Sequence, residues 1–243
     1  MSYDKIEDIE QLEERLKTLA DPKFRAFHIR LIPNIDPNTV LGIRMPVLRK
    51  EAAALSKAGK QDLILTNTAP AFYEEKLIHA LLINKEKEFD RTLSLMEEFL
   101  PQIDCWAVCD ALCCPALAKD PDRLLEHIHI WIRLDRPYTV RFAILMLMKH
   151  FLGTQYDPAH LDLVIWVDVN DYYVRMMQAW YLATAAVDHA RDVFVLLEQG
   201  RIRDDFVHNK TIQKMVESFR ISDEQKVRAK ALKRAVSKKA PNA

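Results

Sequence analysis

The sequence contains little glycine and no long apolar segment. Only four of its 243 residues are glycine, and sheet architectures rich in tight turns use that residue heavily, so the scarcity favours helices. No stretch reaches the ~18 consecutive apolar residues that a membrane span requires, and we expect no membrane association. The acidic, amphipathic first sixteen residues do not resemble a secretory or transit signal, so we expect no leader.

The four cysteines lie within ten residues of one another, at Cys105, Cys109, Cys113 and Cys114. They cannot build a disulfide framework, so they predict a reduced, cytoplasmic protein. The first three fall on one helical stripe, but structural zinc sites favour closer spacings on turns with four converging ligands. We therefore interpret the cysteines as small buried apolar residues and expect no metal. With no Gly-rich phosphate loop or comparable motif, we expect no cofactor.

The formal net charge is zero, which argues against indiscriminate binding to nucleic acid. The charge is nevertheless segregated along the chain. Residues 201–239 contain twelve lysines and arginines against five acidic residues, whereas the first twenty residues contain six acids against three bases. The C-terminal part is therefore predicted to be the basic one.

Apolar residues recur with a helical period along most of the chain, and almost no alternating strand pattern is present. The periodicity predicts a first helix over 4–19 and a short helical piece over 22–31. A further helix is predicted from Pro46, because proline suits the first helical position, to about Ala58. Breakers separate these pieces, at Pro33, Pro37 and Gly42.

A helix-pair repeat follows. First helices are predicted to begin near Phe72, Asp104, Tyr138, Tyr172 and Phe206, which are 32 or 34 residues apart. Second helices are predicted over 87–99, 121–134, 157–168, 189–199 and 222–238. A single pair cannot bury its apolar face, but stacked pairs form a continuous core. The pattern predicts an all-α solenoid of HEAT/ARM-like two-helix repeats with a concave groove. We expect one domain over 1–243, with an N-terminal helical segment over 1–45 and tandem repeats over 46–238, and a monomer.

Basic residues recur at one position of the aligned first helices. Lys76, Arg141, Arg175 and Lys210 share this position, and Val108 occupies it in the intervening repeat. We name these four cations the basic register. Cations aligned along one edge of a solenoid would suit a sugar–phosphate backbone. The alternative is that they are ordinary solvated helix positions.

A tryptophan and a carboxylate stand out in the intervening repeat. Trp106 and Asp110 are four residues apart, hence on one helix face, and burying an unpaired carboxylate is costly. If the helices stack in register, Arg141 and Trp180 lie near the same face. Such a cluster would suit a flat, cationic ligand, because tryptophan is the best cation–π partner and the carboxylate supplies counter-charge. Alternatively, the tryptophans only pack and Asp110 pairs with Arg141.

Several segments, in order and at repeat spacing, resemble the AlkD-like DNA alkylation-repair family. The matching segments are Gly42–Arg49, Tyr73–Lys76, Ile103–Asp110, Val140–Ala143, Tyr172–Arg175 with Trp180, and Asn209–Lys214. The resemblance implies a HEAT-like solenoid that wraps around double-stranded DNA carrying alkylated or distorted sites. We expect the basic register, and Arg44 in the first matching segment, to contact the DNA.

The resemblance further implies a DNA glycosylase that removes N3- and N7-alkylated purines without base flipping. Asp110, Trp106 and Trp180 match the family's catalytic residues, and Arg141 matches its DNA-gripping arginine. An alkylated purine is cationic and leaves as a neutral base, and its departure generates an oxocarbenium-like sugar. Asp110 would stabilise that sugar and position water.

One segment departs from the family pattern. Residues 20–41 are shortened and interrupted by prolines where the family has a helix that leans on the duplex beside the lesion, and only Phe27 is proposed for that role. Two alternatives to a glycosylase therefore stay open. One is a non-catalytic module that binds bent or branched DNA through the basic register. The other is a protein-interaction scaffold, the commonest use of an α-solenoid.

Overall fold

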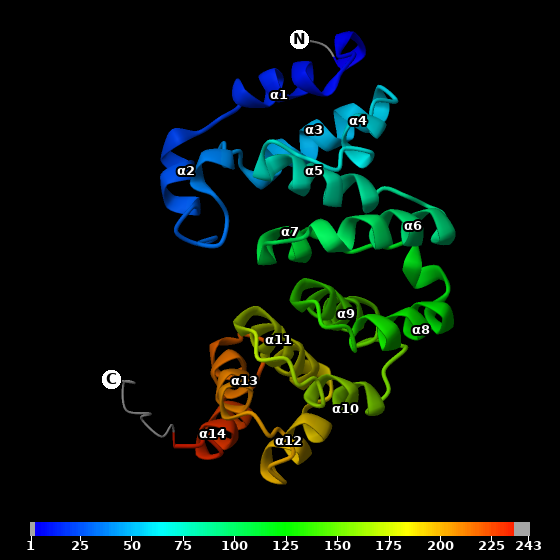
Figure 1. Cartoon of the computed structure of the whole chain (residues 1–243). Coiled ribbons are helices and arrows are strands. Elements are labelled where there is room, and N and C mark those ends of the chain that lie inside the picture. Colours follow the sequence, from blue (N-terminus) through cyan, green and yellow to red (C-terminus); the bar gives the residue numbers. More distant parts are fainter. Residues whose placement is uncertain (1–2, 236–243) are drawn as a thin grey trace. The chain divides into compact units, whose positions relative to one another are not determined.

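The computed structural model describes residues 3–235, and every regular element in that range is a helix. The prediction of an all-α protein is therefore confirmed. The chain divides into two compact units, one ending at Leu124 and the other beginning at Leu125, and each is described by itself below (Figure 1). Within residues 3–235, no helix is both long and apolar enough to cross a membrane.

The first unit begins with helices that are shorter than the sequence predicts. The helix expected over 4–19 is divided into a 3-10 turn, Tyr3–Lys5, and α1, because the carboxylate of Asp8 caps the start of α1 by accepting from the backbone of Gln11. The short helix α4 was not predicted. The α-helices of this unit are α1 (Ile9–Lys17), α2 (Pro22–His28), α3 (Met45–Lys57), α4 (Asp62–Leu65), α5 (Tyr73–Ile83), α6 (Phe89–Phe99) and α7 (Trp106–Ala111). Further 3-10 turns span Pro37–Thr39, Leu100–Gln102 and Leu117–Lys119, and α8 (Pro121–Trp131) crosses the boundary between the units.

The helices of the second unit follow the predicted repeat closely. They are α9 (Pro137–His150), α10 (Ala159–Ile165), α11 (Tyr172–Asp188), α12 (Ala190–Glu198), α13 (Asp205–Glu217) and α14 (Asp223–Ala231). The first helices α9, α11 and α13 each begin within one residue of the predicted start. The last helix was predicted to reach residue 238 and ends at Ala231; residues 236–238 lie outside the described part of the chain.

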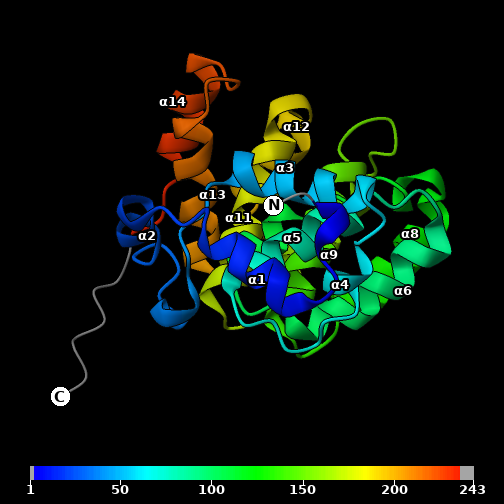
Figure 2. The same ribbon diagram turned by 90° about the horizontal axis from the view of Figure 1, so that it is seen from above.

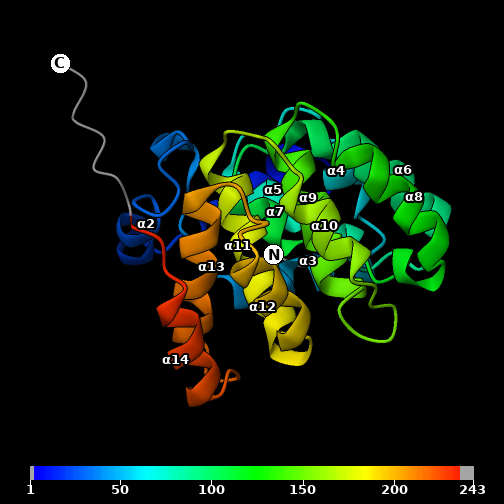
Figure 3. The ribbon, with the colours of Figure 1, turned by 90° about the horizontal axis from the view of Figure 1, so that it is seen from below.

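In both units, the first helix of one pair packs against the first helix of the next. α5 contacts α3 and α7 in the first unit, and α11 contacts α9 and α13 in the second. Figure 3 shows the second unit with α13 beside α11, and with α12 and α14 accompanying them. The first helices are buried on most sides, as in α9, where every residue from Thr139 to Leu147 is buried. This stacking of first helices is compatible with the predicted solenoid.

The N-terminal helix is attached to α3 by a buried carboxylate. Arg15 of α1 binds Glu51 of α3 at 2.7 Å, and the hydroxyl of Tyr3 donates to the same carboxylate. Figures 1 and 2 show α1 lying beside α3. The ion pair holds the amphipathic first helix on the unit, so its apolar residues Leu12 and Leu16 are fully buried.

The turn before α3 depends on one glycine and one glutamate. The buried carboxylate of Glu74 in α5 accepts hydrogen bonds from the backbone N–H groups of Leu41, Gly42 and Ile43, at 3.0, 2.7 and 3.1 Å. Gly42 has φ +81°, and a Cβ there would lie 2.6 Å from the Cβ of Arg25. Glycine is therefore required both by the left-handed backbone and by the close approach of α2.

Gly42→Ala should destabilise the protein by about 3 kcal/mol or more, because a left-handed alanine is strained and its methyl group would clash with α2. Gly59→Ala is the matched control, since Gly59 has φ +66° and no atom within 4 Å of the added Cβ. Only the backbone cost of about 1 kcal/mol is expected there. Urea unfolding measures both losses, and equal losses would show that the contact with Arg25 constrains nothing.

Candidate functional site

The predicted tryptophan–carboxylate pair lies on one short helix of the first unit. α7 contains both Trp106 and Asp110, one turn apart and therefore on one face, and both side chains are half-buried. The indole Nε1 of Trp106 donates to the backbone carbonyl of Leu31 at 2.9 Å. The orientation of the indole is thus fixed by the segment that follows α2.

α7 is short because the side chain of Asn84, at the end of α5, terminates it. The amide of Asn84 donates to the carbonyl of Ala111 at 2.8 Å and accepts from the N–H groups of Cys113 and Cys114 at 2.7 and 3.0 Å. The prediction that Cys113 shares a helical stripe with Cys105 and Cys109 is therefore wrong, because Cys113 lies beyond the end of the helix. Three cysteines are buried, Cys105, Cys109 and Cys114, and Cys113 is partly exposed. Within residues 3–235, no group of three His, Cys, Asp or Glu side chains is arranged to hold a metal ion.

The segment over 20–41 contacts Arg44, the N-cap residue of α3. The Arg44 guanidinium binds the carboxylate of Asp21 at 3.0 Å and lies 4.6 Å from the ring centroid of Phe24. Arg25 donates to the carbonyls of Val40 and Pro37, both at 2.7 Å. These contacts hold α2 in place, and the Arg44 side chain stays 57% exposed.

α2 and the turn after it present apolar side chains to solvent. Phe27 is 52% exposed and Leu31 is 44% exposed. Leu31 is also the residue whose carbonyl binds Trp106. The segment that departs from the family pattern therefore both supports the site tryptophan and exposes Phe27, the residue that the sequence singled out there.

The matching segment Tyr73–Lys76 forms the first turn of α5, and its side chains contact several neighbouring elements. The hydroxyl of Tyr73 lies 3.3 Å from Nε2 of His28 in α2. Glu75 accepts from the backbone N–H of Phe72 at 2.8 Å and from Asn67 at 3.0 Å, and Lys76 binds Asp104 at 2.6 Å. Including Glu74, the segment connects α5 to α2, to the turn before α3 and to the residues that precede α7.

Burial raises the pKa of Glu75 to about 7, with a smaller contribution from the negative charge of Glu13, although the hydrogen bond from Phe72 opposes the shift. A carboxyl group whose pKa is higher in the folded state binds more protons there than in the unfolded chain. Its contribution to stability is therefore fully present below its ordinary value of 4.5 and is lost as the pH rises through about 7.

Glu75→Gln should remove this dependence, which is on the order of 3 kcal/mol between pH 4.5 and pH 7. The free energy of unfolding of the wild type should fall over this range, and that of the variant should fall less. Glu10→Gln, on the exposed side of α1, serves as the control. A variant whose pH profile parallels that of the wild type would exclude Glu75 as the source.

Three residues of the basic register contact the beginning of the next first helix. Lys76 in α5 binds Asp104, which lies two residues before α7. Arg175 in α11 binds Asp204, the N-cap of α13, at 2.9 Å, and Arg141 in α9 donates to the carbonyl of Tyr173 in the first turn of α11. These contacts leave little signal in the sequence, because each partner lies at the start of the following repeat, about 30 residues away from the cation.

These contacts leave the four cations in different environments. Arg141 is only 4% exposed, and the side chains of Lys76 and Arg175 are 19% and 27% exposed. Lys210, in the last first helix, instead contacts the neutral amide of Gln213 at 2.7 Å and lies 5.7 Å from the ring centroid of Phe206. A role of these residues in binding DNA stays a prediction.

Trp180 lies on α11 in the second unit and is 39% exposed. The ammonium group of Lys214 lies 5.9 Å from its ring centroid. Trp180, Thr184 and Lys214 line a surface hollow of about 320 Å³. The structure thus brings Trp106 and Asp110 together on α7, and it places Arg141 and Trp180 on the adjacent helices α9 and α11.

The fold and these residues define an all-helical protein of stacked helix pairs, with a tryptophan–carboxylate face and a series of basic side chains. The family model described as DNA alkylation repair enzyme matches residues 12–229. The chain therefore belongs to this family, as its resemblance predicted, and the family places it in DNA repair with DNA as its partner. No curated protein and no solved structure matches the chain.

Proposed function

We propose that the protein is an alkylpurine-DNA glycosylase that hydrolyses the N-glycosidic bond of N3- or N7-alkylated purines without flipping the base. The observation that carries the proposal is the half-buried face that Trp106 and Asp110 share on α7, in a chain that belongs to the DNA alkylation repair enzymes. The proposal includes a solenoid whose concave groove receives double-stranded DNA, acting as a monomer.

The reaction needs a negatively charged carboxylate more than it needs a proton donor. An alkylated purine already carries a positive charge and departs as a neutral base, so protonation contributes little. The sugar becomes oxocarbenium-like as the bond breaks. Asp110 stabilises this developing cation and orients the attacking water, and both effects lower the barrier only if the carboxylate is held in position.

Trp106 supplies an electron-rich surface for the cationic lesion. Because its N–H is bound to the carbonyl of Leu31, the ring is oriented before DNA arrives. Trp180 makes a second aromatic contact to the lesion, as the match to the family implies. Arg141, which is buried and donates to the carbonyl of Tyr173, supports the first turn of α11 instead of contacting DNA. Phe27, exposed on α2, contacts the duplex. An enzyme that leaves the base stacked needs no deep pocket, in contrast to glycosylases that extrude it.

The test is release of 3- or 7-methylpurine from duplex DNA treated with a methylating agent. The wild type should release the base, and Asp110→Asn, which keeps the size and loses the charge, should lower the single-turnover rate by about 100-fold or more. Thermal unfolding verifies that the variant is folded. No release by the wild type above the level of Asp110→Asn would refute a glycosylase. If both proteins still bound the DNA, a non-catalytic DNA-binding module would be the remaining explanation.

Lys210 provides the sharpest test of DNA binding by the basic register, because its side-chain contacts are to the neutral Gln213 and Phe206. Lys210→Ala should weaken binding to every duplex sequence and reduce the slope of log K against log salt by about one unit. Arg175→Ala, which removes a cation already paired with Asp204, should change the slope less. Binding that does not depend on salt would refute the register as a DNA contact and would favour a protein-interaction scaffold.

A further inference from the structure

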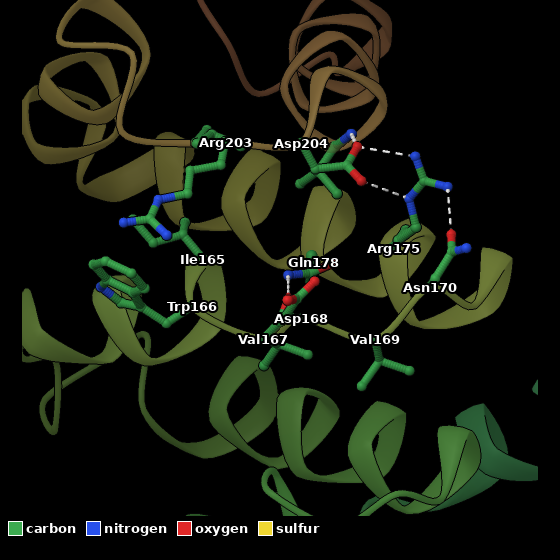
Figure 4. Close-up of a pocket in the computed structure, with 12 residues that line it drawn as sticks. Ile165, Trp166, Val167, Asp168, Val169, Asn170, Arg175, Gln178, Arg203 and Asp204 are labelled. Atoms are coloured by element: carbon green, nitrogen blue, oxygen red, sulfur yellow. Dashed lines mark hydrogen bonds and ion pairs between the residues drawn. The ribbon is translucent and has the colours of Figure 1, made fainter.

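Two neighbouring hollows in the second unit share one wall. The first, about 550 Å³, lies between residues 165–170 and residues 202–204 and is drawn in Figure 4. The second, about 530 Å³, is lined by His129, Arg133 and Asp162 among others. Both are lined by Trp166, Val167, Asp168 and Val169. Each has the size of a small-molecule site, and an extended ligand could occupy both by crossing Trp166.

Trp166 is unusual in being both large and open to solvent. It is 60% exposed, and the guanidinium of Arg203 lies 4.2 Å from its ring centroid (Figure 4). Trp166 lies at the end of α10, where the loop to α11 begins. An aromatic ring with an adjacent guanidinium is the pair that proteins use to stack a nucleobase and to bind its phosphate.

The two arginines that flank Trp166 differ from their neighbours. Within residues 3–235, neither Arg203 nor Arg133 has a carboxylate within ion-pair distance, whereas Arg201 is paired with Asp162 at 2.6 Å and Arg175 is paired with Asp204. Each hollow therefore contributes one cation without an acidic partner, with the exposed indole between them.

The loop that carries Trp166 is held rigidly. Gln178 of α11, which is 3% exposed, donates to the carbonyls of Val164 and Val167 at 2.8 and 3.1 Å. Arg175 connects Asn170 at one side of the first hollow to Asp204 at the other (Figure 4). The shape of the hollow is therefore set before a ligand binds, which lowers the entropic cost of binding.

We propose that this surface binds an unpaired DNA strand, with a base stacked on Trp166 and successive phosphates at Arg203 and Arg133. The carboxylate of Asp168, on the shared wall, would repel a phosphate and accept hydrogen bonds from base N–H groups, so it lies on the base side of the site. Two hollows with one cation each favour a strand of at least two nucleotides over a free nucleotide. This site is separate from the Trp106–Asp110 face and goes beyond the proposed glycosylase.

Fluorescence anisotropy of a labelled single-stranded oligonucleotide of eight deoxyadenosines tests the proposal. Trp166→Ala should weaken binding roughly tenfold, since one stacked base is lost. Trp166→Phe, which retains an aromatic face, should bind more tightly than Trp166→Ala. Arg203→Ala and Arg133→Ala should each lower the salt slope by about 0.7, the value for one phosphate contact of a single strand. Unlabelled deoxyadenosine monophosphate should compete far more weakly than the unlabelled oligonucleotide.

Arg191→Ala is the matched control, because it removes an equal charge from an exposed position of α12 in the same unit and lines neither hollow. A loss with Arg191→Ala as large as that with Arg203→Ala would overturn the proposal, since it would reveal only non-specific attraction. Wild-type binding by both Trp166 variants would also overturn it, as would equal competition by the mononucleotide. If Trp166→Ala failed to fold, Trp166→Phe and the arginine variants would still test the proposed binding site. Asp110→Asn should bind the oligonucleotide as the wild type does, so failure of glycosylase activity would not be confused with failure of this site.

Discussion

The starts of three first helices, α7, α11 and α13, are each attached to the preceding first helix of the same unit by a basic side chain. A helix start leaves unpaired N–H groups, and an acidic residue placed there satisfies them and introduces a negative charge. Asp204 shows both functions, because it accepts from the backbone of Val207 and also binds Arg175 one repeat earlier. In the first unit, Lys76 forms the same kind of ion pair with Asp104, which directly precedes the N-cap residue of α7. The two cations and their acidic partners are 28 and 29 residues apart in the sequence, so each pair joins one first helix to the next.

The candidate site depends on a second long-range attachment. Trp106 lies on a helix of only six residues, which could not hold a large side chain in one orientation by its own stability. The carbonyl of Leu31 accepts its N–H, and Asn84 terminates the helix. The segment over 20–41, which looks reduced in the sequence, is therefore part of the support of the site.

Much of the fold could be predicted from the sequence because its determinants are local. Tyr172 begins α11 because Asp171 caps it, and Pro137 begins α9 because proline fits a first helical turn. The end of α7 could not be predicted, since it is imposed by Asn84, 27 residues away. The acceptor for Trp106 is a backbone carbonyl, which leaves no signal in the sequence. The burial of Arg141 was also missed, because an arginine on a helix is ordinarily solvated and its acceptor is again a carbonyl, that of Tyr173. The site at Trp166 has no recognisable motif and emerges only when two loops lie side by side.

In the proposed reaction, the face of α7 that bears Trp106 and Asp110 meets the sugar of the lesion. The most direct measurement is a crystal structure of the protein bound to a duplex that contains a cationic aza-sugar in place of one nucleotide, a mimic of the oxocarbenium-like sugar. In that complex, the Asp110 carboxylate should lie within hydrogen-bond distance of the charged ring nitrogen, with the Trp106 indole beside it. A complex in which the aza-sugar is remote from α7, with Asp110 contacting only the protein, would contradict the proposal.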